Sequence, residues 1–242
     1  MNRVLITVAF IVILSACTTG TVATPTLPSA TSEARTSAAT ASPTPASSPT
    51  PASTDAALAL PDADDLELGR YYFEFEGYRF TFTVAEPGWS GSVEAAGVYR
   101  GEDEELAIFW PGGDIPTLYR RACEWSGTDF EPRSSVDDLA NALASLEDFE
   151  STAPADVTVG GFAGRHVALT VPLDVDFSTC DAGNFQRDPG RHYQAPGQTD
   201  DVYVLDLDGE RQTIVVSHTS DTPAEIETQL QEMLDSLEIT PK

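Results

Sequence analysis

Lysine, and positive charge in general, are scarce in this sequence. Lysine occurs once, at Lys242, and the 242 residues contain 13 Lys and Arg against 39 Asp and Glu, a formal net charge of −26. A chain with this surplus of negative charge repels phosphate backbones and anionic lipid headgroups. We therefore expect no nucleic acid partner and no direct docking of the folded part onto a lipid surface.

The N-terminal apolar run is too short to be a good membrane anchor. It extends over residues 4–14 behind Arg3 and contains one polar residue, Thr7. A transmembrane helix needs about 20 apolar residues. A short apolar run behind a positive charge is instead typical of a secretory signal peptide, which predicts export of the chain.

The run ends in Leu14-Ser15-Ala16-Cys17, which resembles the lipobox of bacterial lipoproteins: a branched apolar residue, two small residues and a cysteine. The resemblance implies that residues 1–16 are a lipoprotein signal peptide, cleaved after Ala16, and that Cys17 is acylated. Two acyl chains anchor a protein stably, because each buried CH₂ contributes about 0.8 kcal/mol. We predict attachment to the cell membrane through the lipid on Cys17, facing outside the cytoplasm. The alternative is an ordinary secretory signal with a chance cysteine at its end.

Residues 17–61 are predicted to be the lipidated cysteine followed by a disordered tether. The segment is rich in Ser, Thr, Pro and Ala, has Ser-Pro and Thr-Pro steps as in Ser48-Pro49-Thr50-Pro51, and has no aromatic residue. It cannot bury enough apolar surface to offset the entropy of ordering. As a coil it would hold the domain roughly 35 Å from the membrane. Such stretches are also sugar acceptors in exported proteins, and an unmodified spacer is the alternative.

Residues 62–242 are predicted to form a single domain, because no second linker interrupts them. Its two cysteines, Cys123 and Cys180, are an even pair in an exported chain, which favours a disulfide. Closing a loop of nearly sixty residues would contribute about 4 kcal/mol. A metal site is the alternative, but no Cys-x-x-Cys or His-x-x-x-His pattern accompanies the cysteines. We therefore predict no metal.

Familiar catalytic patterns are missing as well. There is no Gly-x-Ser-x-Gly, His-Glu-x-x-His, P-loop or dinucleotide fingerprint, which disfavours common hydrolases and nucleotide-binding proteins. The histidines His166, His192 and His218 look too scattered to indicate a metal site or a general base. We expect no cofactor and no catalysis. The alternative is an envelope enzyme with an unrecognised site, for which His192, Tyr193 and Asp188 are the loop cluster to inspect.

Alternation of apolar and polar residues predicts two β-hairpins, at 71–84 and at 201–218, the second around the turn signal Asp208-Gly209. Further strands are predicted at 105–110 and 165–171. The strand 201–207 has apolar residues on both faces, which favours a central position in a sheet. Three tryptophans are expected in the core or at its rim rather than in a ligand site; they are Trp89, Trp110 and Trp125.

Helical spacing of apolar residues predicts two helices. One starts after the cap residue Ser135. The other is C-terminal, with Thr222-Pro223-Ala224-Glu225 as a capping box and Pro223 at the first helical position. The order of strands and helices predicts an α+β fold with a mainly antiparallel sheet flanked by helices.

Several of these elements together resemble the PsbP-like architecture, which is found in exported bacterial lipoproteins. The resemblance implies an α/β/α sandwich around an antiparallel sheet, and a domain that binds proteins or small ligands and shares no catalytic constellation with its relatives. It rests on Phe82 to Trp89, the helix after Ser135, Val157 to Gly164, the Asp208-Gly209 hairpin and a closing helix from Leu230 to Ile239.

Basic residues cluster around the two domain cysteines, on either side of a Cys123–Cys180 bridge. Such a bridge would gather them into one basic neighbourhood on an acidic domain, and arginine suits carboxylates. We predict a candidate anion-binding site there. The alternative is that these arginines pair internally with Glu124, Asp181 or Asp188. The members of the candidate site are Arg120, Arg121, Arg187, Arg191 and His192.

These features predict a lipid-anchored binding or protein-interaction module of the bacterial cell envelope, without catalysis. Its partner would be an envelope protein or a small ligand whose identity the sequence does not give. Two alternatives stay open: an envelope enzyme with an unrecognised site, and a structural or stress-related surface lipoprotein. A pocket with convergent polar groups would favour the binding module.

Overall fold

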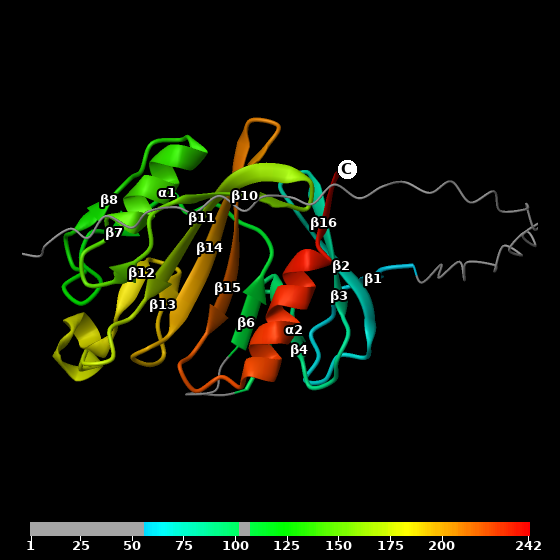
Figure 1. Ribbon diagram of the computed structural model, residues 1–242, viewed down its shortest axis with the longest axis horizontal. Coiled ribbons are helices and arrows are strands. Elements are labelled where there is room, and N and C mark those ends of the chain that lie inside the picture. Colours follow the sequence, from blue (N-terminus) through cyan, green and yellow to red (C-terminus); the bar gives the residue numbers. More distant parts are fainter. Residues whose placement is uncertain (1–55, 102–106) are drawn as a thin grey trace, which may run out of the picture. The chain divides into compact units, whose positions relative to one another are not determined.

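The computed structural model describes residues 56–101 and 107–242. The signal peptide, Cys17 and most of the predicted tether therefore lie outside the described residues. Among the residues that are described, no helix is long and apolar enough to cross a membrane. The described part is an α+β fold, dominated by antiparallel strands, with two α-helices (Figure 1).

The larger sheet has eight strands in the order β10-β11-β14-β15-β6-β5-β4, with β9 also paired to β11. All of its pairings are antiparallel. The hairpin around Asp208-Gly209 is confirmed, and its strands β14 and β15 lie at the centre of the sheet, as predicted from the apolar residues on both faces. The strands are β4 (Ser90–Ser92), β5 (Gly97–Arg100), β6 (Ala107–Trp110), β9 (Glu150–Ser151), β10 (Ala155–Val159), β11 (Phe162–Thr170), β14 (Thr199–Leu207) and β15 (Glu210–His218).

A second sheet has four strands in the order β1-β2-β3-β16. The predicted hairpin at 71–84 is confirmed as β2 (Gly69–Phe75) and β3 (Tyr78–Val84). The strand β16 (Glu238–Pro241) pairs with β3 and was not predicted. Ile239, which the family resemblance assigned to a closing helix, lies in this strand and is buried.

The predicted boundary of the tether at residue 61 is wrong. Leu58 and Ala59 form β1, which pairs in parallel with Tyr71 and Tyr72 of β2. Leu60 is buried, and its backbone N–H donates to the Tyr72 carbonyl at 2.8 Å. Leu60 marks the start of the folded part, because its apolar side chain is buried at the sheet edge, whereas Leu58 stays exposed.

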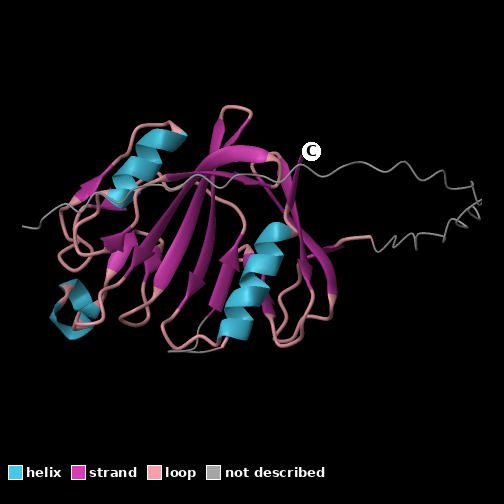
Figure 2. Cartoon of the chain, viewed as in Figure 1, coloured by secondary structure: helices cyan, strands magenta, loops and turns pink. Residues whose placement is uncertain are grey.

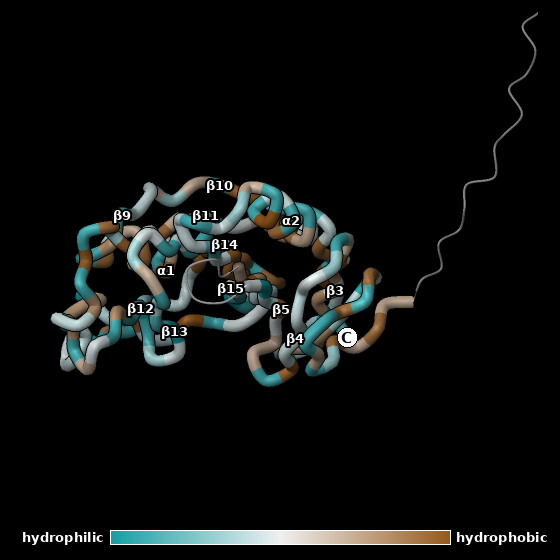
Figure 3. Tube along the Cα trace, turned by 90° about the horizontal axis from the view of Figure 1, so that it is seen from below, coloured by the Kyte–Doolittle hydropathy of each residue, from teal (hydrophilic) through white to brown (hydrophobic). Residues whose placement is uncertain are grey.

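The two helices pack on opposite faces of the large sheet. Alternate residues of a strand point to opposite faces, and the two sides of β14 belong to different cores. Leu205 packs in one hydrophobic core with residues of α2 (Ala224–Asp235). Val204 packs in a separate hydrophobic core with residues of α1 (Val136–Ala144). Figures 2 and 3 show the two helices well apart, with β14 and β15 between them.

The helix starts follow the sequence with one correction. The Ser135 hydroxyl accepts a hydrogen bond from the Asp138 N–H at 3.0 Å, so the predicted cap of α1 is confirmed. Helix α2 begins at Ala224, and Pro223 occupies its cap position without a side-chain hydrogen bond. The Thr222 hydroxyl instead accepts from the Thr219 N–H at 3.0 Å. The predicted capping box therefore does not form: the cap position falls on Pro223, which has no hydroxyl, and the Thr222 hydroxyl closes a turn before the helix.

A smaller part of the chain lies beyond one end of the sheet, and we call residues 117–130 and 176–193 the cystine lobe. Its small core consists of Ala122, Cys180, Phe185 and Tyr193, packed with Val171, which directly follows β11. Its strands are only two or three residues long and form two separate pairs, β7 with β8 and β12 with β13. These elements are β7 (Leu118–Tyr119), β8 (Asp129–Phe130), β12 (Gln186–Asp188), β13 (Arg191–His192) and the 3₁₀ turns η2 (Phe177–Thr179) and η3 (Asp181–Gly183).

Candidate functional site

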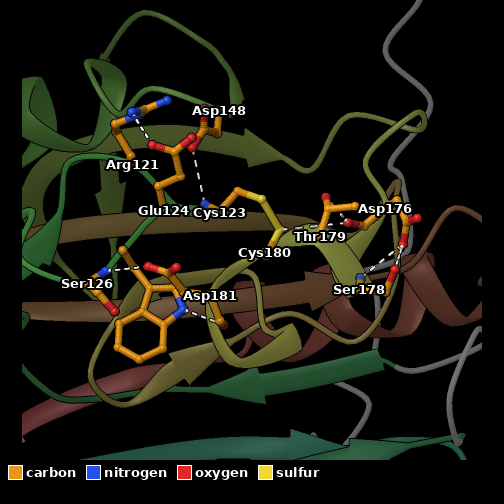
Figure 4. Close-up of a disulfide and its surroundings, with 11 residues drawn as sticks. Arg121, Cys123, Glu124, Ser126, Asp148, Asp176, Ser178, Thr179, Cys180 and Asp181 are labelled. Carbon is orange, nitrogen blue, oxygen red and sulfur yellow. Dashed lines mark hydrogen bonds and ion pairs between the residues drawn. A yellow bond between two sulfur atoms is a disulfide. The ribbon is translucent and has the colours of Figure 1, made fainter.

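A disulfide joins Cys123 to Cys180 and brings the two halves of the cystine lobe together. The backbone N–H of Asp181 donates to the Cys123 carbonyl at 2.9 Å, and Gln186 donates in the same way to Ala122. Figure 4 shows the disulfide among its neighbours. The two stretches that carry the predicted basic cluster therefore lie side by side.

The arginines nearest Cys123 have partners different from those of the arginines in the other stretch. Arg121 forms ion pairs with Glu124 and Glu147, and Figure 4 shows its guanidinium turned toward Glu124. Arg120 is exposed, and its guanidinium carbon lies 4.7 Å from the centre of the Phe130 ring. Neither of them joins a basic cluster with the other half of the lobe.

Arg187 and Arg191 are buried and converge on one carboxylate, Asp200, which is fully inaccessible to solvent. Arg191 donates from Nε at 2.9 Å and from Nη2 at 2.5 Å, and Arg187 donates from Nη1 at 3.1 Å. The Tyr193 hydroxyl donates to the same carboxylate at 3.0 Å. Arg187 also pairs with Asp188 at 2.8 Å. Two positive and two negative charges therefore balance inside the fold.

The protonation behaviour of this network follows from its burial and its pairing. Burial would raise the pKa of the Asp200 carboxyl, but Arg191 and then Arg187 more than offset it and lower the pKa to about 2. Burial also disfavours the charge of Arg187, yet the negative charge of Asp188 raises its pKa overall. Burial and the Asp200 charge raise the pKa of Tyr193 well above its usual range. All three groups keep their ordinary neutral-pH forms.

The exposed anion-binding site predicted from Arg120, Arg121, Arg187, Arg191 and His192 does not form. Arg187 and Arg191 face a buried carboxylate, which neutralises the charge that an anion would need. The alternative of internal pairing describes Arg121, Arg187 and Arg191, with Glu124 and Asp188 among the partners as predicted. Asp181 is not one of them, since its carboxylate accepts from the Ser126 N–H at 2.9 Å. Arg120 has no ion pair among the described residues and contacts the Phe130 ring instead.

The loop cluster named for an enzyme does not converge either. The hydroxyl of Tyr193 donates inward to Asp200, and Asp188 is tied to Arg187. His192 is exposed on the short strand β13. The three side chains therefore do not face one shared reacting position.

A pocket of about 300 Å³ opens beside the buried network and is lined by Trp110, Asp114, Arg187 and Arg191, among others. The guanidinium carbon of Arg191 lies 4.9 Å from the Trp110 ring centre and 4.6 Å from that of Tyr193. Because both arginines are already paired with aspartates, this pocket offers little net attraction to an anion.

A second pocket of the cystine lobe has a different lining, and we call it the aromatic pocket. Its volume is about 470 Å³, within the usual range of small-molecule sites. The rings of Tyr119 and Trp125 lie 5.5 Å apart between centres and are tilted by 42°. The Trp125 Nε1 donates to the Asp181 carbonyl at 3.0 Å, which ties the pocket to the second half of the lobe. Its lining is Thr117, Tyr119, Trp125, Ser126, Gly127, Asp129 and Pro189.

Strand register explains how this pocket arises. Tyr119 of β7 stands directly opposite Asp129 of β8, so the two side chains are neighbours on one face of the pair. Pro189 enters from the turn between β12 and β13. The sequence placed Trp125 in the core or at its rim, and the structure leaves it partly exposed in a pocket wall. The sequence signal that could have indicated this position is that Trp125 lies two residues after Cys123 of the predicted disulfide.

A further polar cluster also escaped the sequence interpretation. His166 Nε2 lies 2.7 Å from one oxygen of Asp201, and His218 Nε2 lies 3.9 Å from the other. His218 Nδ1 lies 3.6 Å from Glu227 of α2, and the His166 ring stacks on Tyr203 with centres 4.7 Å apart. Two of the three histidines that look scattered in the sequence therefore lie beside one carboxylate, because the pairing of β11, β14 and β15 brings them together.

Within the described ranges, no group of three or more His, Cys, Asp or Glu residues is arranged to hold a metal ion. The cluster around Asp201 does contribute to the electrostatics of the sheet. Burial, followed by the charges of Asp201 and Asp235, raises the pKa of Tyr203 to about 12.

Comparison with known proteins gives a weak structural likeness. No protein family model matches the chain, and no curated protein matches it. Among solved structures, the solution structure of cyanobacterial PsbP (CyanoP) from Synechocystis sp. PCC 6803 superposes with a TM-score of 0.36 and 15% sequence identity. The match covers 72% of this chain and 92% of that one. The neighbour has the PsbP fold that the sequence resembles, but so low a score supports no argument about function.

Proposed function

We propose that this chain is a lipid-anchored binding module that works outside the cytoplasmic membrane and takes a small ligand group into the aromatic pocket. The group would be a free molecule or part of an envelope protein. The observation that carries the proposal is the pocket itself, in which two aromatic rings stand beside three polar side chains of the same stretch, residues 117–129.

The anchoring part of the proposal rests on the Leu14-Ser15-Ala16-Cys17 sequence, which lies outside the described residues. The tether between Cys17 and the folded part would place the pocket clear of the lipid headgroups. We include in the proposal the PsbP-like α/β/α arrangement that the sequence resemblance implies. Packing of α1 and α2 against opposite sides of β14 supports it.

The binding part rests on the construction of the pocket. Ligand sites typically combine apolar or aromatic walls with a few fixed polar groups. Tyr119 and Trp125 supply the walls here, and Thr117, Ser126 and Asp129 supply the polar groups. Fixed walls favour binding, because less entropy is lost when a ligand enters. The disulfide and the Trp125 to Asp181 hydrogen bond hold the two sides of the pocket together.

Acylation tests the anchor. Replacing Cys17 with Ser should abolish fatty acylation of the chain in the producing bacterium, because the sulfur that accepts the lipid is lost. Mass spectrometry of the N-terminal peptide measures it. Normal acylation of the Cys17→Ser protein would overturn the lipoprotein assignment.

A pair of substitutions at Tyr119 tests the pocket. Native mass spectrometry of the full chain, isolated from envelope extracts, should detect a ligand retained by the wild type and by Tyr119→Phe, which keeps the ring. The ligand should be lost from Tyr119→Ser, which removes it. Equal retention by all three proteins, or no retained ligand in any of them, would contradict a binding role for this pocket.

A further inference from the structure

The aromatic pocket has a distinctive charge as well as a distinctive shape. None of its seven lining residues is basic, and one of them, Asp129, is acidic. Asp129 is exposed, and within the part of the chain that the structure describes its carboxylate has no hydrogen bond or ion pair. The pocket therefore presents an uncompensated negative charge beside two aromatic rings.

The nearest arginine in the sequence is turned to another side. Arg120 follows Tyr119 directly, but its guanidinium lies over the ring of Phe130. Phe130 pairs with Leu118, whereas Asp129 pairs with Tyr119, so the two pairs occupy opposite faces of the β7–β8 ladder. The positive charge of Arg120 is thus on the face away from the pocket.

Aromatic rings attract cations through the negative potential over their faces. The chain as a whole has a net charge of −26, which raises the local concentration of cations and repels anions. A small inorganic cation would have to give up its water to touch the rings, and one exposed carboxylate offers little in return. A cation whose charge is spread over methyl groups is weakly hydrated and packs its apolar surface against the rings.

We propose that the aromatic pocket between Tyr119, Trp125 and Asp129 binds a weakly hydrated organic cation of the quaternary ammonium class. This inference rests on the proposed function. The methyl groups contact the two ring faces and Pro189. Asp129 supplies the opposite charge. Thr117 and Ser126 offer hydroxyl groups to a polar substituent of the same ligand.

The test compares two probes of nearly equal shape. Choline and its uncharged isostere 3,3-dimethylbutan-1-ol are titrated calorimetrically into the full chain in about 0.15 M NaCl, which screens unspecific attraction to the acidic surface. Choline should bind saturably and at least about tenfold more tightly than the neutral isostere, because only its positive charge is attracted electrostatically by the ring faces and by Asp129.

Matched variants assign the binding to the pocket. Asp129→Asn should weaken choline about fivefold, whereas Glu131→Gln removes the same charge from an exposed neighbour outside the lining and should leave binding unchanged. Tyr119→Phe should bind as the wild type does. Tyr119→Leu keeps an apolar side chain without a ring and should weaken choline about fivefold.

The possible outcomes test the cationic ligand class and the proposed binding function separately. Equal affinity for choline and its isostere, or equal effects of Asp129→Asn and Glu131→Gln, would overturn the cationic ligand while leaving a binding pocket in place. Absence of choline binding, combined with a different molecule retained in a Tyr119-dependent way, would do the same. If no probe binds and no ligand is retained through Tyr119, the proposed function falls as well.

Discussion

Replacing Asp200 with Asn is the most incisive perturbation of this fold. Asp200 is completely buried at the start of the central strand β14 and accepts four hydrogen bonds, three from arginines and one from Tyr193. Asn keeps the size of the side chain but removes its charge. Arg191 would lose its only ionic partner among the described residues, and Arg187 would keep Asp188 alone.

The expected cost follows from the burial of those charges. Removing one partner of a buried ion pair typically costs about 3 to 5 kcal/mol, because the remaining charge stays desolvated and unpaired. We expect Asp200→Asn to lower the free energy of unfolding by that amount. For a domain of this size, such a loss corresponds to a fall in melting temperature of about 6 to 20 °C.

Urea denaturation followed by circular dichroism measures the effect, and Asp201→Asn is the matched control. Asp201 is the next residue of the same strand, points to the other face and is a quarter exposed, with His166 as its closest partner. Because solvent still reaches this pair, it is expected to contribute about 1 kcal/mol, well below the loss expected at Asp200. A loss at Asp200 no larger than that at Asp201 would refute the assignment of a structural role to the buried network.

A milder variant keeps the prediction testable if Asp200→Asn does not fold. Tyr193→Phe removes one hydrogen bond to the carboxylate and keeps the ring, which packs edge-on against Phe149 and Phe185. Hydrogen bonds to charged groups are worth about 1.5 to 3 kcal/mol, so a loss of that order is expected. A change close to zero would count against the network in the same way.

Two further predictions concern pH and the disulfide. The folded-state pKa of Asp200 is about 2, below its ordinary value of 3.8. Its pairing therefore stabilises the fold by about 2 kcal/mol above pH 4, and this gain is lost as the pH falls from 4 through 2. The difference in urea stability between the wild type and Asp200→Asn should shrink over that window, and a constant difference would contradict it. Replacing Cys123 and Cys180 with Ala opens a loop of 57 residues and should cost about 4 kcal/mol in urea denaturation. A loss below about 1 kcal/mol would show that the lobe does not depend on the bridge.

The sequence predicted the elements whose signals are local. The Asp208-Gly209 turn and the alternation around it gave β14 and β15, and apolar residues on both faces of β14 gave its central position. The N-cap at Ser135 is local in the same sense, since its donor is three residues away. A strong apolar periodicity over seven or more residues is therefore sufficient to predict that an element exists and whether it is a helix or a strand.

Elements that depend on distant partners were missed. The strand β16 is four residues long and exists because Ile239 pairs with Phe80, more than 150 positions earlier in the chain. The strand β1 likewise needs Tyr71 and Tyr72 as its partners. Such short strands carry no periodicity of their own, because two to four residues span at most two alternations.

In the candidate site, too, local signals were predictable from the sequence and distant contacts were not. Closeness of the Cys123 and Cys180 segments followed from counting cysteines in an exported chain, and the structure has a disulfide there. The partners of the arginines could not be predicted, because the sequence contains 39 acidic residues and no pattern singles out Asp200. The pairing of Arg191 with Asp200 depends on contact between β14 and the β12–β13 hairpin, which only the three-dimensional fold determines.

The position of the buried charges links the stability of the cystine lobe to the proposed binding role. The lobe contributes only four buried residues to its small core, and each of its strand pairs has only two paired positions, so little apolar burial holds the lobe in place. The disulfide ties its two halves together, and the Asp200 network fastens β12 and β13 to the central strand. A buried ion cluster is seldom more stabilising than apolar residues of equal volume, but it accepts few alternative geometries. Pro189, in the turn between Asp188 and Arg191, is thereby held in position as one wall of the aromatic pocket, which reduces the entropy lost when a ligand enters.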